Sequence, residues 1–210
     1  MPKVVDHEQR RSEIAMALWL VIYEHGIDGV SFRSVALAAG VSVGRVQHYF
    51  SSKQELVLHG CRRMVAAAVE DHGPAAIPED PRAARAELLT HLSGSLHDGE
   101  EFRTGASVWA SYQAKAVSDP AIGEIVAGAM EEREDLLAEL LAAARGARAA
   151  SAASSGRPAP SATDRGVALH LAALSEGLAQ RVLVGALPAE DAREVLRAEV
   201  DRWTTRSRAS

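Results

Sequence analysis

The amino-acid sequence predicts an all-α protein of about nine helices. Hydrophobic residues make up 47% of the chain but aromatic residues only 4%, and the excess is mainly alanine and leucine, which favour helix over sheet. Apolar residues recur at helical spacing in segment after segment. No segment shows the strict apolar–polar alternation and hairpin turns of half-buried strands.

Four helices are expected in the first third of the chain. The first carries an apolar stripe and stops at Gly26. Ser31 and Ser42 are capping residues that begin two short helices separated by Gly40. The sequence SKQE then forms a capping box, in which Ser52 binds the Glu55 amide while the Glu55 side chain reaches back. The predicted ranges are about 14–25, 31–39, 42–50 and 52–72.

Five longer helices are expected in the rest of the chain. Asp80-Pro81 and Asp119-Pro120 each combine a capping residue with a first-turn proline. The small-residue and proline-containing segment 146–163 is predicted to be a mobile loop. The predicted helices span about 81–97, 101–117, 120–146, 164–186 and 188–206.

The charge is distributed unevenly along the chain. Residues 1–63 hold eight Lys/Arg against six Asp/Glu, whereas the remainder holds fifteen against twenty-two, for a net charge of -5. Such asymmetry is expected when only one part of a protein approaches a polyanion. The sequence has no signal-peptide pattern, no apolar run near the roughly 20 residues of a membrane span, and a single cysteine. We therefore expect a cytoplasmic protein without a membrane contact.

The two short helices joined by a glycine turn match a helix-turn-helix, whose second helix fits the DNA major groove. Arg45 can donate two hydrogen bonds to guanine, and Gln47 can pair with adenine. Each polar residue alone would more often be a solvated surface group, but together with both caps they favour double-stranded DNA binding. The predicted DNA-contacting residues are Ser31, Arg33, Ser42, Val43, Arg45, Gln47, His48, Tyr49 and Lys53.

The stretch GVSFRSVALAAGVSVGRVQHYFSSKQEL resembles the N-terminal DNA-binding domain of the TetR family of bacterial transcriptional regulators. The likeness covers about residues 10–60. It implies phosphate contacts from Tyr49 and Lys53, base reading by Arg33, Arg45 and Gln47, and a core position for Phe50. Arg45 replaces the usual threonine, and Gln47 replaces the first aromatic residue of the family pattern, so the operator sequence does not follow from the resemblance. We place a DNA-binding domain at 1–51 and a ligand-binding and dimerisation domain at 52–210.

The last two helices are predicted to form a homodimer interface, as the resemblance also implies. The first of them is apolar nearly all round and must be covered on several sides. A symmetric four-helix interface would cover it, and burial within one subunit is the alternative. The predicted interface residues are Leu171, Leu174, Leu178, Val182, Leu196, Val200 and Trp203.

A group of aromatic and polar residues in the larger domain is a candidate pocket for a small-molecule effector of unknown identity, and packed core is the alternative. The residues are Met64, His91, Phe102, Trp109, Tyr112, Gln113 and His170.

The function expected from these features is a transcriptional regulator, a repressor that a small molecule releases from a palindromic operator. The sequence contains no phosphate-binding glycine loop, nucleophile elbow, zinc-protease helix or cysteine pair, so we expect no enzyme and no cofactor. Two alternatives stay open. The first is a DNA-binding protein whose second domain is a protein-interaction scaffold, and the second is a helical metal sensor or enzyme.

Overall fold

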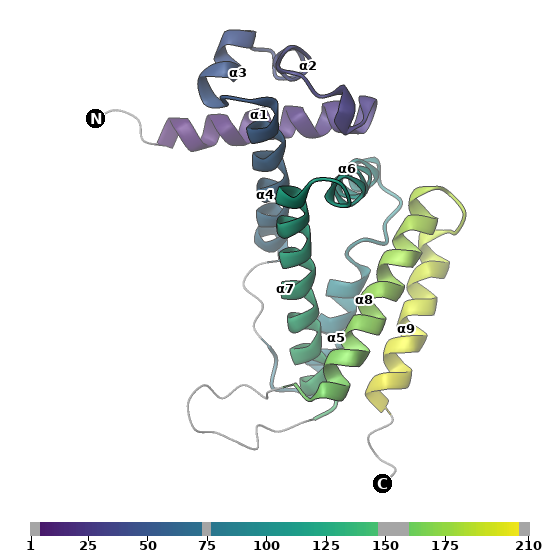
Figure 1. The fold of residues 1–210 in the computed structure, drawn as a ribbon. Coiled ribbons are helices and arrows are strands. Elements are labelled where there is room, and N and C mark those ends of the chain that lie inside the picture. The colour runs from purple at the N-terminus through teal and green to yellow at the C-terminus, as the bar shows by residue number, and fades with distance from the viewer. Residues whose placement is uncertain (1–4, 73–76, 147–159, 206–210) are drawn as a thin grey trace, which may run out of the picture. The chain divides into compact units, whose positions relative to one another are not determined.

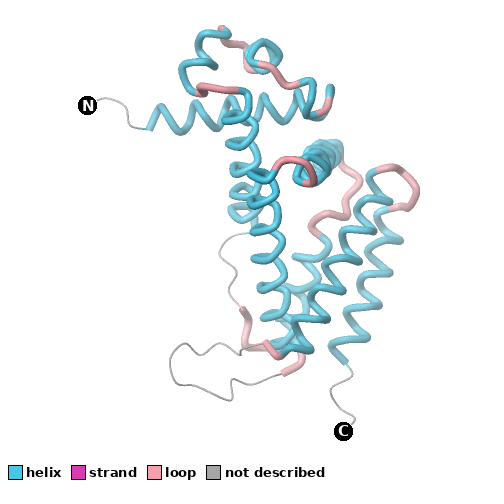
Figure 2. The backbone as a smooth tube through the Cα atoms, in the orientation of Figure 1, coloured by secondary structure: helices cyan, strands magenta, loops and turns pink. Residues whose placement is uncertain are grey.

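The computed structural model describes residues 5–72, 77–146 and 160–205. Within these residues the chain forms nine α-helices and one 3-10 turn, and no strand (Figures 1 and 2). This confirms the predicted all-α fold. Most of the predicted mobile loop, residues 147–159, lies outside the described residues. The elements are α1 Val5–His25, η1 Ile27–Gly29, α2 Phe32–Ala38, α3 Val43–Tyr49, α4 Lys53–His72, α5 Pro81–Ser93, α6 Glu100–Ala116, α7 Pro120–Ala144, α8 Ala162–Leu183 and α9 Ala189–Thr205.

The chain divides into two compact units. Unit 1 comprises Met1–Asp71 and Thr104–Ala129, and unit 2 comprises His72–Arg103 and Met130–Ser210. Unit 1 therefore holds α1 to α4 together with most of α6 and the start of α7. The functional boundary at residues 51/52 stays a prediction, because a compact packing unit need not coincide with a functional domain.

The turn between α2 and α3 depends on a glycine. Gly40 has a φ of +64°, in the left-handed region that side-chain-bearing residues rarely adopt. This conformation lets the Val41 amide donate to the Ala36 carbonyl at 3.0 Å. The Ser31 hydroxyl accepts from the Ser34 amide and the Ser42 hydroxyl from the Arg45 amide, so both predicted caps are confirmed.

The start of α4 corrects one detail of the predicted capping box. The Ser52 hydroxyl accepts from the Glu55 amide at 3.1 Å, as predicted. The Glu55 carboxylate, however, accepts from the amide and the hydroxyl of Ser51, at 2.8 and 2.7 Å, rather than from Ser52. Both serines carry an amide and a hydroxyl donor, so the backbone geometry at the start of α4 selects Ser51. These bonds hold the pKa of Glu55 below its usual 4.5.

Helices α1, α4 and α6 meet at very short range inside unit 1. The Trp19 indole donates to the Gly60 carbonyl at 3.1 Å, and the Tyr112 hydroxyl donates to the Val57 carbonyl at 3.3 Å. A Cβ on Gly60 would lie 2.4 Å from Leu18 Cδ2 and 2.7 Å from Tyr112 Oη. The next residue, Cys61, is fully buried, and burial raises the pKa of its thiol to about 11.

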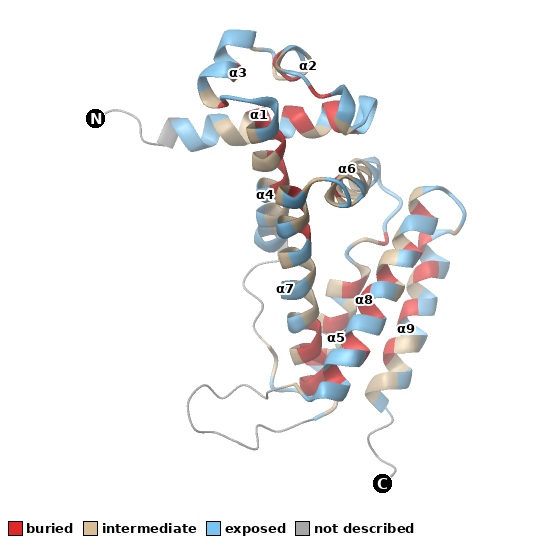
Figure 3. Ribbon diagram, in the orientation of Figure 1, coloured by how far each residue is buried: buried red, intermediate tan, exposed pale blue. Residues whose placement is uncertain are grey.

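The core of unit 2 comes from α5, α7, α8 and α9, whose buried faces are shown in Figure 3. One buried polar cluster ties the ends of three of these helices together. Asp164 accepts from the amide and hydroxyl of Ser161, the capping residue of α8, and from Arg145 just beyond α7. Arg145 also donates to the Trp203 carbonyl on α9 at 2.9 Å. None of the described helices is long and apolar enough to cross a membrane.

Candidate nucleic-acid interface

Helix α3 is anchored by one face and leaves the opposite face open. Val46 and Phe50 are 0% and 1% exposed, so they fix the helix to the core of unit 1. Phe50 thus lies in the core, as predicted. Of the nine predicted DNA-contacting residues, Tyr49 is half-buried and all the others are exposed. The arrangement leaves Arg45, Gln47 and His48 free to meet a partner.

Arg11 of α1 holds the C-terminal end of α3 in place. Its guanidinium donates to the Tyr49 carbonyl at 2.7 Å and lies 4.4 Å from the centre of the Phe50 ring. It also lies 3.3 Å from Nδ1 of His59 and 3.7 Å from the Glu55 carboxylate, both on α4. One side chain therefore links α1, α3 and α4 and fixes the direction of the exposed face. Sequence reasoning missed it, because its partners lie 38 to 48 residues away.

Two further exposed residues of unit 1 were not among the predicted DNA contacts. Leu37 at the end of α2 is 84% exposed, and an apolar side chain at such a site can contact the methyl group of thymine. The centre of the His7 ring of α1 lies 4.8 Å from the centre of the Tyr49 ring, which also neighbours the His48 ring. Leu37 could have been identified from the sequence by its position, because an apolar residue that directly follows the inward-facing Val35 and Ala36 points away from the core.

Lys53 is exposed, and its ammonium donates to the Asp28 carbonyl of η1 at 3.1 Å. An ammonium has three donors, so this bond leaves two for another acceptor. The predicted phosphate contact of Lys53 stays a prediction.

The pH dependence of stability should report on the contact between Arg11 and His59. The guanidinium can only donate, so Nδ1 of His59 accepts and the neutral ring is favoured. Burial first, and then the charge of Arg11, lower the pKa of His59 from 6.5. The unfolded chain therefore takes up a proton at a higher pH than the folded one. This contribution to stability is complete above pH 6.5 and is lost as the pH falls through the lower folded pKa.

We expect His59→Asn to flatten the loss of stability between about pH 7 and pH 5. Urea melts of wild type and variant at several pH values give the free energy of unfolding as a function of pH. Glu55, Asp164 and Glu199 also lose stabilising bonds on acidification, but their pKa values are lowered from 4.5 or 3.8, so they act in a more acidic range. Parallel curves for wild type and variant would contradict the role of His59.

The residues of the predicted effector pocket are divided between the two units. Tyr112 has no exposed surface and its hydroxyl is bonded to Val57, so it belongs to the core. The His170 side chain is 53% exposed and pairs with Glu199 at 3.3 Å, so it lies on the surface of α8. The placement of Tyr112 fits the packed-core alternative, and the effector pocket itself stays a prediction. The other five residues of the predicted pocket are half-buried. Met64, Trp109 and Gln113 lie in unit 1, and His91 and Phe102 lie in unit 2.

The predicted dimer residues are mostly core of a single chain. Five of the seven, Leu171, Leu178, Val182, Leu196 and Val200, are between 0% and 7% exposed in one protomer, and they therefore offer no surface to a second copy. Leu174 and Trp203 are half-buried and pack against the same core. The burial of these five within one subunit is the alternative that the sequence left open.

A different face of α8 and α9 is both apolar and exposed. Exposed apolar residues follow helical spacing along α8, where Leu169 is 52% exposed, and α9 carries exposed apolar residues of its own, with Val195 48% exposed. We call this exposed apolar face the α8/α9 stripe. Its residues are Gly166, Leu169, Ala173, Gly177, Val195 and Ala198.

No group of three or more His, Cys, Asp or Glu side chains that could hold a metal ion occurs among the described residues.

Two family profiles match separate parts of the chain. Residues 17–59 match the profile of bacterial regulatory proteins of the tetR family, and residues 84–205 match the C-terminal profile of BetI-type transcriptional repressors. The first match contains the helix-turn-helix and the start of α4, and the second extends from α5 to the end of α9.

The curated relatives that match the chain are also transcriptional regulators. The transcriptional regulator PksA of Bacillus subtilis is 53% identical over 57 residues, which is 27% of this chain and 28% of that protein. The regulator BetI of Ectopseudomonas mendocina is 28% identical over 122 residues, covering 58% of this chain and 62% of that protein. The chain thus spans less than two thirds of the length of these relatives.

Solved structures share the fold over nearly the whole chain. A TetR-family regulator from Rhodococcus sp. superposes with a TM-score of 0.75 at 25% identity, covering 93% of this chain and 99% of that one. A transcriptional regulator from Saccharomonospora viridis, solved in complex with choline, superposes with a TM-score of 0.74 at 21% identity, covering 92% and 96%. On these matches, and on the helix-turn-helix described above, the chain belongs to the TetR family of bacterial transcriptional regulators and has a BetI-type C-terminal domain.

Proposed function

We propose that this protein is a DNA-binding transcriptional repressor that acts as a homodimer and is released from its operator by a small molecule. The observation that carries the proposal is the exposed face of α3. This face carries the exposed side chains of Arg45, Gln47 and His48. The opposite side of the helix is packed into the core through Val46 and Phe50. A short helix anchored in this way can present base-reading side chains to the major groove at little loss of conformational entropy.

Base reading is tested by selecting duplexes from a randomised pool with the wild type and with Arg45→Ala and Gln47→Ala. Each variant should lose discrimination at particular base pairs, at about 1–3 kcal/mol for each bidentate contact removed. Lys53→Ala should instead weaken binding to all sequences and lower the salt slope by about one. Arg82→Ala, an exposed arginine of α5, is the control that should change neither quantity.

If all three variants of the helix-turn-helix keep both the affinity and the selectivity of the wild type, these residues do not read DNA. A wild-type protein that selects no duplex at all would reject the proposed function itself.

The homodimer is proposed to form through the α8/α9 stripe. The glycine and alanine residues of this stripe let a second helix approach closely. A second copy related by two-fold symmetry presents the same stripe, so the two stripes can pack against each other. The operator should then contain two symmetric half-sites about one helical turn or more apart.

We expect Leu169→Glu to split the dimer while each protomer stays folded, because Leu169 is 52% exposed in the single chain. Val117→Glu is a matched control, since Val117 is a 90% exposed residue after α6 and outside the stripe. Light scattering gives the mass, and circular dichroism checks the fold. Dimer mass for Leu169→Glu would mean that the dimer uses another surface.

The small-molecule part of the proposal rests on the BetI-type domain and on the fold. The related structure from Saccharomonospora viridis contains choline, so a protein of this fold can hold a small organic molecule. A screen of metabolites for those that raise the melting temperature of the protein tests this part. If the hit is the effector, it should also lower the affinity of the protein for the selected duplex, and the duplex should weaken binding of the hit by the same factor.

A further inference from the structure

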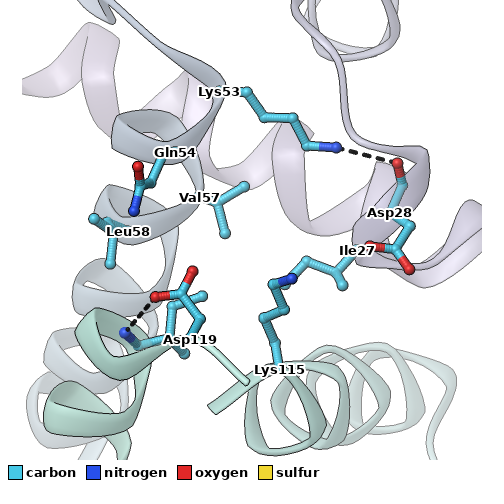
Figure 4. A pocket seen from close by; sticks show the side chains of 9 residues that line it. Ile27, Asp28, Lys53, Gln54, Val57, Leu58, Lys115 and Asp119 are labelled. Atoms are coloured by element: carbon cyan, nitrogen blue, oxygen red, sulfur yellow. Dashed lines mark hydrogen bonds between the residues drawn. The ribbon is translucent and has the colours of Figure 1, made fainter. Parts of the chain in front are cut away.

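A cavity of about 340 Å³ lies within unit 1, where four elements meet. Its walls come from η1, from the first turns of α4 and from the corner between α6 and α7 (Figure 4). The volume is in the range of sites that bind small organic molecules. None of the residues predicted to line the effector pocket borders it.

Two lysine side chains reach into this cavity from different elements. Lys53 comes from the start of α4 and Lys115 from the end of α6, and Figure 4 shows both extending toward Ile27 and Asp28 of η1. The Lys53 ammonium has the Asp28 carbonyl as an acceptor at 3.1 Å. Among the described residues, no carboxylate forms an ion pair with Lys53 or Lys115.

Neither of the two carboxylates of the cavity forms an ion pair with these cations among the described residues. Asp119 accepts from the amides of Ala121 and Ile122, at 3.1 and 3.4 Å, and so serves as the N-terminal cap of α7. Asp28 is exposed to solvent, where its field is screened. The lining therefore holds two ammonium groups and two carboxylates, without a net formal charge. Because neither lysine is ion-paired within the part of the chain that the structure describes, both keep hydrogen-bond donors that a bound anion can use.

The rest of the cavity wall is largely apolar. Val57 and Ile122 are 6% and 1% exposed, and Leu58 and Ile27 are half-buried beside them. An apolar wall next to two cations suits a molecule with a hydrocarbon body and a single negative charge. The body would remove apolar surface from water, and the anion would accept charge-assisted hydrogen bonds.

We infer that this cavity is a regulatory site for small amphiphilic organic anions, of the aliphatic carboxylate class. The regulatory part rests on the proposed function, because Lys53 is also a predicted phosphate contact. A carboxylate held between Lys53 and Lys115 takes donors away from the DNA backbone. Anion and operator therefore weaken each other's binding by the same factor.

The site is tested first without DNA, by calorimetry with octanoate, octylammonium and octanol. Wild-type protein should bind octanoate more tightly than either of the others, because all three share the chain and differ in the charge. Lys115→Gln should weaken octanoate binding by about tenfold or more, the effect of losing one charge-assisted hydrogen bond. Lys115→Arg, which keeps the cation, should retain most of the binding. Equal binding of octanoate and octylammonium, or no difference between wild type and Lys115→Gln, would overturn the site.

The coupling is tested second, with a duplex selected by the wild-type protein. Octanoate should lower duplex affinity by about fivefold or more, and this effect should be lost in Lys115→Gln. Octanoate binding without any effect on duplex affinity would overturn the regulatory role. A protein that binds octanoate through Lys115 but selects no duplex would contradict the proposed function and leave the anion site standing.

Discussion

Replacing Asp164 by alanine is expected to lower the free energy of unfolding of unit 2 by about 3–5 kcal/mol, the usual effect of removing one partner of a buried ion pair. Asp164 is 7% exposed and accepts three hydrogen bonds, from Arg145 and from the amide and hydroxyl of Ser161. The alanine variant leaves the Arg145 guanidinium without its counter-ion and α8 without half of its capping box. Burial raises the pKa of Asp164, but these bonds outweigh it and lower the pKa below 3.8.

The matched control is Asp135→Ala. Asp135 also pairs with an arginine, Arg165, at 2.6 Å, but the two side chains are 64% and 59% exposed. Solvent-exposed pairs contribute about 1 kcal/mol or less. Denaturant melts of both variants give the comparison. Similar losses for the two would show that burial does not strengthen the contribution of Asp164.

Gly60→Ala is expected to destabilise unit 1 by about 1–3 kcal/mol, although alanine is the better helix former. The added Cβ would lie 2.4 Å from Leu18 Cδ2 and 2.7 Å from Tyr112 Oη, and both side chains are fully buried. Neither can move aside without disturbing its own packing.

Gly105→Ala on α6 is the control, because a Cβ there meets nothing within 4 Å. It should stabilise the protein by about 0.5–1 kcal/mol through helix propensity alone. The two substitutions thus have the same chemistry and opposite expected signs. Thermal or urea melts that show a gain for both would mean that α1, α4 and α6 are packed more loosely at Gly60 than the structure indicates.

Helix boundaries in this chain were predictable because their causes are local. Ser31, Ser42 and Ser52 each bond an amide three residues on, and nothing distant competes for them. Local errors remain: α1 begins at Val5 rather than at about residue 14, and α5 ends at Ser93 rather than at about residue 97. The partner of Glu55 was also wrong, because Ser51 and Ser52 are chemically alike and only the backbone geometry decides between them. The exposed face of α3 followed from the same short-range pattern.

Assignments that depend on tertiary contacts could not be made from the sequence. Leu169 and Leu171 are two positions apart on a helix that is apolar nearly all round, yet one is exposed and the other buried. No periodicity separates a core-facing leucine from a partner-facing one on such a helix. The role of Arg11 depends on residues that only the fold brings beside it. The cavity at Lys115 is lined by residues from four separate elements.

The chemical reactivity of the buried Cys61 reports local opening of unit 1. At neutral pH a thiol with a pKa of about 11 is ionised to only about one part in ten thousand, so its chemistry with disulfide and maleimide reagents is suppressed in the folded state. It is also the chain's sole thiol, and thus every modified molecule marks one event in which α4 left its packing. The rate of thiol capture therefore reports the opening of unit 1 without an engineered cysteine and without denaturant.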